Sequence, residues 1–124
     1  MMRVLIADDA AWLRSALRLL LEEEFNLEIV GEVSETITLL SALQHLTPDA
    51  VLLDWALPGL QSPADRRAFI AALRAMCPCV CLVMLCGQRE ESRPLPLSGI
   101  DAWISKAEPP QQLLATLATL WPTP

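Results

Sequence analysis

Apolar and polar residues alternate along the chain in blocks whose periodicity switches between that of strands and that of helices. Five short apolar runs predict buried strands: Arg3–Ala7, Leu27–Val33, Ala50–Leu53, Cys79–Leu85 and Ala102–Ser105. Between these runs, apolar residues recur every three or four positions, as they do in amphipathic helices. Helices are therefore expected over Ala10–Glu24 and Glu35–Leu46, from Pro63 onward, and from Pro109 or Pro110 onward. Alternating strands and helices predict an α/β fold, with a parallel sheet covered on both faces.

The apolar stripe of each helix predicts which side chains face the core. The expected inward residues are Leu13, Leu17, Leu20 and Leu21; Ile37, Leu40 and Leu43; Phe69, Ile70, Leu73 and Met76; and Leu113, Leu114, Leu117 and Leu120. Asp9 precedes the first helix and is expected to cap it. The segment Gly87–Gly99 contains Pro94 and Pro96, so we expect a helical turn or two at Gln88–Ser92 and then an irregular link.

The composition narrows the class of protein. With 124 residues, 53% of them hydrophobic, the chain is expected to form a single domain over residues 1–124. The net charge is −6, and the nine basic residues, of which only Lys106 is a lysine, form no stripe, which argues against direct nucleic-acid binding. The longest apolar run, Val80–Cys86, is too short to span a membrane, and Asp8 and Asp9 interrupt any signal sequence. We therefore expect a cytoplasmic protein without a membrane partner.

Three of the four cysteines, Cys77, Cys79 and Cys81, occupy every second position. In a strand they would share one face, where neighbours are poorly placed for a disulfide. A structural metal site would normally use Cys-x-x-Cys pairs on loops. We therefore expect reduced, small, buried residues of a core strand.

Residues capable of chemistry follow several of the predicted strands. Asp8 and Asp9 follow the first strand, Asp54 follows the third, and Cys86 follows the fourth. Lys106 comes just after the fifth strand. Ligands of such sheets bind beyond the carboxyl ends of the strands, so three carboxylates and the only lysine are expected to converge there.

This set of residues predicts phosphoryl chemistry at a metal site. Carboxylates that lie close together remain ionised only if a cation sits among them, and all-oxygen ligands at a half-open site favour Mg²⁺. A nearby lysine can neutralise a phosphoryl group, and a carboxylate beside Mg²⁺ can attack phosphorus to give an aspartyl phosphate.

Three motifs in the expected order resemble those of bacterial response-regulator receiver domains. They are Asp8-Asp9, Leu52-Leu53-Asp54-Trp55-Ala56-Leu57-Pro58-Gly59, and Gly99-Ile100-Asp101-Ala102-Trp103-Ile104-Ser105-Lys106. The start of the chain and the Ser-Lys-Ala ending are most similar to receivers of helix-turn-helix transcription factors. The resemblance covers essentially the whole chain. It implies a flavodoxin-like (βα)5 fold, doubly wound, with strand order 2-1-3-4-5 and, in this chain, a shortened or irregular fourth helix.

The resemblance also implies a role for each site residue. Asp54 would accept a phosphoryl group from a histidine kinase or phosphotransfer protein, and Lys106 would hold a phosphoryl oxygen. Asp9 and Asp54 would bind Mg²⁺ together with the Ala56 backbone carbonyl, while Asp8 would act mostly through water. The protein would be a signalling receiver that catalyses only its own phosphorylation and dephosphorylation, and it could form a homodimer.

Two residues depart from the family pattern. Cys86 stands where the family carries Thr or Ser, and a thiol is the weaker hydrogen-bond donor. Trp103 stands at the aromatic switch position, usually Tyr or Phe, where we favour packing over switching. The alternative function is therefore a degenerate receiver that acts as a phosphorylation-independent interaction or dimerisation module. Trp12 and Trp55 flank the acidic edge and would shield it or form a contact surface.

Two other classes of α/β protein fit the sequence poorly. A flavin- or nucleotide-binding domain would need a phosphate-binding glycine cluster, and the four glycines of this chain are scattered. A phosphatase with an aspartate nucleophile would usually carry Asp-x-Asp after its first strand, a pattern that is missing here.

Overall fold

A computed structural model describes residues 1–87 and 99–121. One parallel sheet contains β1 (Met2–Ala7), β2 (Leu27–Val33), β3 (Ala50–Asp54), β4 (Cys81–Cys86) and β5 (Ala102–Ser105). Its strand order is β2-β1-β3-β4-β5, as predicted. The helices of the described residues are α1 (Ala11–Glu22), α2 (Thr36–Leu46), α3 (Pro63–Met76) and α4 (Pro110–Leu120). A helical turn was expected at Gln88–Ser92, as a shortened form of the family's fourth helix. This segment falls outside the described residues.

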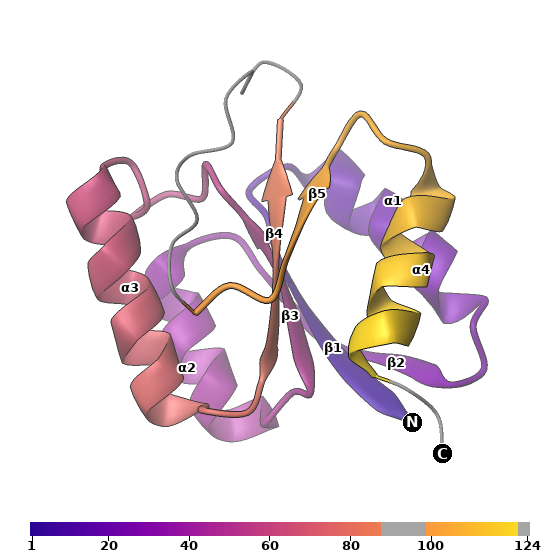
Figure 1. Ribbon diagram of the computed structural model, residues 1–124, viewed down its shortest axis with the longest axis horizontal. Helices are drawn as coiled ribbons and strands as arrows, with labels where there is room; N and C mark the ends of the chain where they lie inside the picture. The colour runs from indigo at the N-terminus through magenta and orange to yellow at the C-terminus, as the bar shows by residue number, and fades with distance from the viewer. Residues whose placement is uncertain (88–98, 122–124) are drawn as a thin grey trace.

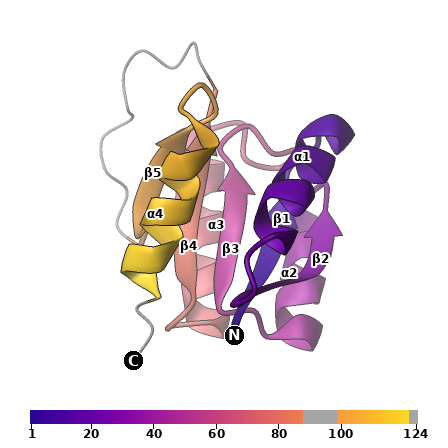
Figure 2. The same ribbon diagram turned by 90° about the vertical axis from the view of Figure 1, so that its right-hand side faces the viewer.

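The helices form a layer on each face of the sheet, α1 and α4 on one and α2 and α3 on the other (Figures 1 and 2). The central strands β1 and β3 are covered on both faces, so apart from Arg3 and Asp54 their residues are apolar without alternation. From Val4 to Ala7 and from Ala50 to Leu53 every side chain is fully buried. No helix of the described part is long and apolar enough to cross a membrane.

Each helix layer packs its own apolar cluster against the sheet. The buried helical residues are Leu17, Leu21, Leu113 and Leu117 on one face and Leu39, Leu43, Phe69, Ile70 and Leu73 on the other. The predicted stripes of α1, α3 and α4 are thus confirmed. In α2 the prediction was partly wrong, because Ile37 is 77% exposed and Leu39 takes the buried position. The α2 sequence is apolar on more than one side, so its periodicity fits two faces.

The start of α1 differs from the prediction. Ala10 is the N-cap residue and no side chain caps the helix, so the expected cap by Asp9 is wrong. Asp8 instead accepts a hydrogen bond from the Ala10 amide through Oδ1, at 2.9 Å. The Asp8 carboxylate therefore fixes the backbone at Ala10, where the chain enters α1.

The cysteine-rich segment is a turn that leads into a strand. Cys77 ends α3, and its carbonyl accepts a hydrogen bond from the Val80 amide, so the chain turns before β4 begins at Cys81. Cys77 and Cys81 are half-buried and Cys79 is exposed. The prediction of three buried cysteines on one strand face is therefore wrong.

The loop after β3 is fixed against α2. Gly59 has a φ of 101°, and a Cβ at this position would collide with Thr36 Oγ1. The Thr36 amide also donates a hydrogen bond to the Pro58 carbonyl at 3.2 Å. Glycine thus permits the left-handed backbone at residue 59 and the close approach of this residue to Thr36. Both hold the loop that follows Asp54 in place.

Candidate functional site

Three aspartates meet at the carboxyl edge of the sheet. β1 and β3 are paired with Ala7 opposite Leu53, so Asp8 and Asp54 occupy adjacent positions at the strand ends. Asp8 is fully buried and Asp54 is 3% exposed, whereas Asp9 is exposed. One oxygen from each carboxylate lies within 4.8 Å of the others.

Lys106 joins this cluster from the other side of β4. Its amide donates to the Cys86 carbonyl at 2.7 Å, which ties the end of β5 to the end of β4. Its Nζ lies 2.8 Å from Asp8 Oδ2 and 3.1 Å from Asp54 Oδ1, and its side chain is 24% exposed. The structure thus brings together the three carboxylates and the lysine that the sequence placed at strand ends.

Backbone amides orient the two buried carboxylates. The Ala10 amide donates to Asp8 Oδ1 at 2.9 Å, and the Ala56 amide donates to Asp54 Oδ1 at 3.0 Å. Each bond spans two residues, as in an Asx turn. Asp8 Oδ2 is buried, and its partner among the described residues is the Lys106 ammonium, at 2.8 Å.

Burial dominates the electrostatics of the site. Burial raises the pKa of Asp54 above its usual range, and the charge of Asp8 adds to this rise, while the Ala56 amide and Lys106 oppose it. For Lys106, burial lowers the pKa, but the contacts with Asp8 and Asp54 outweigh this effect and leave the pKa raised. One ammonium among three carboxylates leaves two negative charges unbalanced when all four groups are ionised.

The residues present fit a divalent cation. The donors are carboxylate oxygens, one of the carboxylates is exposed to solvent, and the Lys106 ammonium balances only one of the three negative charges. Mg²⁺ prefers such oxygen ligands and keeps several of its waters. The acidic cluster could therefore hold Mg²⁺. The Ala56 carbonyl as a further ligand remains a prediction.

Cys86 and Trp55 lie at the ends of β4 and β3, next to the Asp54–Leu85 pair, and Trp103 lies in β5. Cys86 is buried at the end of β4, where it pairs in register with Ser105. Trp103 is half-buried, and its ring centroid lies 5.0 Å from that of Trp55, with the ring planes at 60°. Trp55 is buried, at 4% exposed, while Trp12 is 74% exposed and is the one of the two that offers a contact surface.

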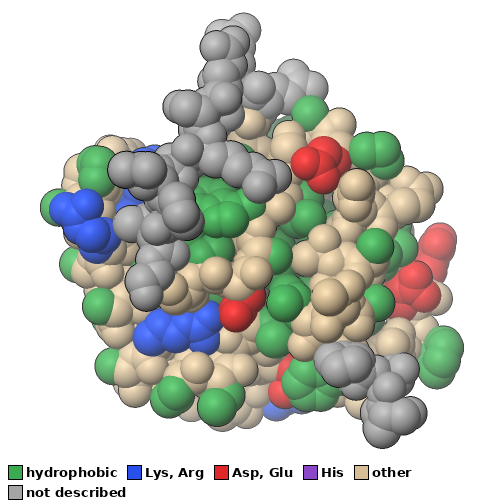
Figure 3. All heavy atoms as spheres, in the orientation of Figure 1, with side chains coloured by type: hydrophobic (Ala, Val, Ile, Leu, Met, Phe, Trp, Pro, Cys, Tyr) green, Lys and Arg blue, Asp and Glu red, His purple; other side chains and the backbone are tan. Residues whose placement is uncertain are grey.

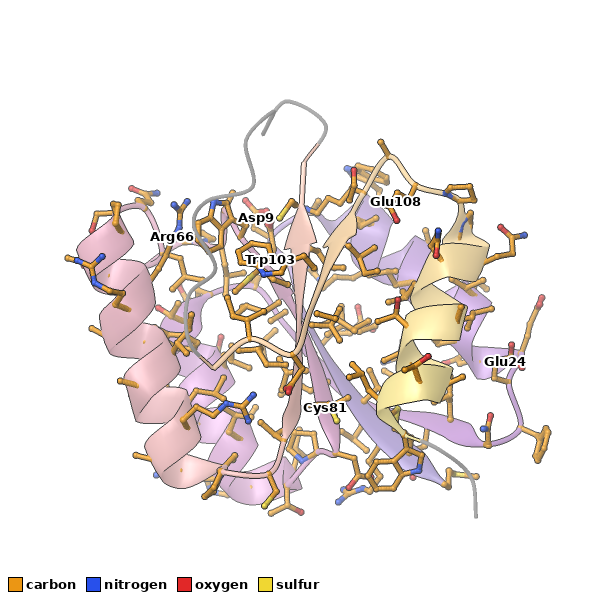
Figure 4. All side chains as sticks on the ribbon, viewed as in Figure 1. Asp9, Glu24, Arg66, Cys81, Trp103 and Glu108 are labelled. Carbon is orange, nitrogen blue, oxygen red and sulfur yellow. The ribbon has the colours of Figure 1, made fainter. Side chains whose placement is uncertain are left out.

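Two arginines near the site were missed by the sequence analysis. The guanidinium of Arg66, a residue of α3 that Figure 4 labels, lies 3.7 Å from the centroid of the Trp55 ring. Arg14 donates from Nη1 to the Asp8 backbone carbonyl at 2.6 Å. Arg14 lies outside the apolar stripe of the first helix, and no local pattern signals a contact with the preceding strand end.

Comparison with known proteins agrees with this geometry. The family model of the response regulator receiver domain matches residues 4–118. The transcriptional regulatory protein BtsR of Shigella flexneri is 41% identical over 83 residues, which cover 60% of this chain and 34% of BtsR. The chemotaxis protein CheY of Halobacterium salinarum is 30% identical over 108 residues, which cover 84% of this chain and 83% of CheY.

A solved structure is also similar. The isolated REC domain of RcsB from Salmonella enterica serovar Typhimurium, solved with the phosphomimetic BeF3-, has a TM-score of 0.80 and 26% identity, covering 96% of this chain and 87% of that one. The chain spans only 25% and 34% of the length of two of the curated relatives it matches. By the match of nearly its whole length to the family model, together with the strand order and the acidic cluster, the chain belongs to the response regulator receiver domain family.

Proposed function

We propose that the chain is a phosphoacceptor in which Asp54 receives a phosphoryl group from the phosphohistidine of a histidine kinase or phosphotransfer protein. One observation carries the proposal. The Lys106 ammonium lies between the buried carboxylates of Asp8 and Asp54, and Asp9 completes an acidic cluster beside them. Among the described residues one ammonium faces three carboxylates, which suits a site that receives a second cation and a phosphoryl group together.

The reaction needs little beyond positioning and neutralisation of charge. An oxygen of Asp54 forms the new bond to phosphorus while the P–N bond of the phosphohistidine breaks. The electron pair leaves with the imidazole, which takes up a proton. Asp54 Oδ1 is already engaged by the Ala56 amide and Lys106, so we assign the attack to Oδ2. Lys106 then neutralises a phosphoryl oxygen.

Asp9 and Asp54 would hold Mg²⁺, with the Ala56 carbonyl as a further ligand, and Asp8 would contribute mostly through water. The bound ion would neutralise the phosphoryl oxygens during transfer. The RcsB REC domain solved with the phosphomimetic BeF3- supports the phosphoacceptor role by relationship.

The test is intact-mass measurement after incubation with Mg²⁺ and a small phosphodonor at neutral pH. The wild-type protein should gain one phosphoryl group, and Asp54→Asn should gain none. Asp65→Asn is the matched control, because Asp65 is an exposed carboxylate in the first turn of α3. A wild-type protein that stays unlabelled while a known receiver is labelled contradicts the proposal, as does labelling that survives in Asp54→Asn.

The second candidate is a phosphorylation-independent interaction or dimerisation module. It is favoured by the packing of Trp103 against Trp55, which leaves the ring at the switch position already engaged, and by Cys86 in place of a hydroxyl. Light scattering with and without BeF3- separates the two candidates. Unchanged oligomeric state and partner affinity after confirmed binding of the mimic favour the module.

We further propose that residues 1–124 act as one cytoplasmic receiver domain with protein partners. The net charge of −6 supports protein over nucleic-acid partners. The Lys and Arg side chains visible on the face in Figure 3 lie mainly on the α3 side and do not merge into one stripe.

A further inference from the structure

We propose that Arg14 is a positioning residue of the acidic site, which fixes the peptide group between Asp8 and Asp9 and thereby directs the Asp9 carboxylate toward the other two. The inference rests on the proposed function, because it assigns Arg14 a role in the binding of Mg²⁺. Nothing in the receiver motifs of this sequence points to Arg14.

The contact that carries the inference is short and charge-assisted. Arg14 Nη1 donates to the Asp8 backbone oxygen at 2.6 Å, from a side chain that is 20% exposed. That oxygen belongs to the peptide group linking Asp8 to Asp9. A guanidinium held on it limits rotation of the peptide plane that sets the direction of the Asp9 side chain.

The guanidinium is itself anchored on the neighbouring strand. Arg14 Nε lies 3.3 Å from Glu32 Oε1, and Glu32 belongs to β2. The next residue, Val33, accepts a hydrogen bond from the Asp8 amide at 3.1 Å. Both peptide groups flanking Asp8 are therefore tied to the end of β2, one directly and one through Arg14. Figure 2 shows α1 lying beside β1 and β2, as this bridge requires.

Asp9 depends on this bridge more than the other two aspartates do. Asp8 and Asp54 are each held by a backbone amide and by Lys106. Within the described residues, the Asp9 carboxylate has neither a hydrogen bond nor an ion pair, and it is exposed. Among the described contacts, only the backbone at Asp9 therefore keeps its carboxylate within reach of the cluster.

Arg18 provides a matched control for Arg14. It lies one turn further along α1 and binds the other oxygen of Glu32, at 2.6 Å, and also Glu22, but its described contacts do not include Asp8. Arg14→Met and Arg18→Met both remove one ion pair to Glu32. Only Arg14→Met removes the hydrogen bond to the Asp8 carbonyl.

The experiment measures Mg²⁺ affinity by tryptophan fluorescence, together with the free energy of unfolding in urea. Arg14→Met should raise the Mg²⁺ dissociation constant about tenfold, the usual effect of removing a group that orients a metal ligand. Arg18→Met should leave that constant within about twofold of wild type. Both variants should lose a similar small part of the unfolding free energy, so a merely structural role would not separate them.

A metal-free readout and a second variant keep the test decisive. In a chelator, amide hydrogen exchange at Asp9 and Ala10 should be faster in Arg14→Met than in Arg18→Met. Should Arg14→Met fail to fold, Arg14→Gln, whose amide is too short for the bridge, should show the same tenfold loss. Unchanged Mg²⁺ affinity in a folded Arg14 variant, or an equal loss in Arg18→Met, overturns the inference. Wild-type protein that neither binds Mg²⁺ nor accepts a phosphoryl group overturns the proposed function instead.

Discussion

At the scale of single residues, the site is organised around the charge of Lys106. Asp8 and Asp54 are almost completely removed from water, and each is in contact with the one ammonium. Buried charges without partners are costly, so the lysine stabilises the fold as well as serving the proposed chemistry. The two roles can be separated, because a bound metal ion would balance the buried carboxylates and so stabilise the fold, but it would not replace Lys106 in the proposed chemistry.

Lys106→Met should destabilise the metal-free protein. Breaking a buried ion pair typically costs several kcal/mol, and the partial exposure of Lys106 reduces this to about 2 kcal/mol. Urea unfolding in a chelator measures the loss, and Mg²⁺ should restore part of it. Arg18→Met, which breaks more exposed pairs, should cost less than about 1 kcal/mol. Equal losses in the two variants would refute the special position of Lys106.

Cys86→Thr should strengthen the link between phosphorylation and Trp103. A hydroxyl at the end of β4 donates a better hydrogen bond to a phosphoryl group than a thiol does. The expected result is a larger change in tryptophan fluorescence on adding BeF3- than in wild type. Trp103→Phe in both backgrounds isolates the Trp103 signal from that of the other three tryptophans. Identical fluorescence changes in the wild-type and Cys86→Thr proteins would contradict this prediction.

The sequence predicted those site residues whose position follows from the strand that precedes them. Asp8, Asp54 and Lys106 follow strands of one parallel sheet, so the topology alone brings them together. Arg14 and Arg66 could not be found in this way. Each reaches the site from a helix through a long side chain, and the reach depends on how that helix packs, which a single sequence does not encode in a local pattern.

At the scale of elements, the inward-facing side chains of a helix were predicted correctly where its sequence has one apolar stripe, and partly wrongly where it is apolar on two sides. α3 has one clear stripe, and its start was marked by Pro63, with Ser62 accepting a hydrogen bond from the Asp65 amide. α2 is apolar on more than one side, so packing against the sheet decided for Leu39 over Ile37. The strand predicted from Cys79 likewise began too early, because the cysteines before β4 are apolar but form a turn. Apolarity alone does not mark where a strand begins.

The loop between β3 and α3 provides a prediction at this scale. Gly59→Ala should destabilise the protein by about 1–3 kcal/mol, because a Cβ there is strained at positive φ and collides with Thr36. Urea unfolding measures the loss. Gly87→Ala is the matched control, since its added Cβ meets open space. Thr36→Gly should recover part of the loss in the double mutant. A cost no larger than that of Gly87→Ala would show that the loop is not held in this way.

At the scale of the whole molecule, the two helix layers hold the strand ends from both faces. The site draws its groups from β1, β3 and the segment after β5, and the covered central strands fix their spacing. The carboxylates are thus held near one another before any ligand arrives. Repulsion among them remains in the metal-free protein, so a bound cation should stabilise the entire fold and not the site alone.

Mg²⁺ should therefore raise the unfolding temperature of the wild-type protein. An ion that binds only the folded state adds about 2.7 kcal/mol at a concentration one hundred times its dissociation constant. Differential scanning calorimetry in Mg²⁺ and in a chelator measures the effect. Asp9→Asn is the informative control: Asp9 is exposed and outside the Lys106 ion pairs, and its neutralisation relieves repulsion in the cluster. This variant should therefore be at least as stable as wild type in the chelator but lose most of the Mg²⁺ response. A full response in Asp9→Asn would place the ion elsewhere and remove the metal site from the proposal.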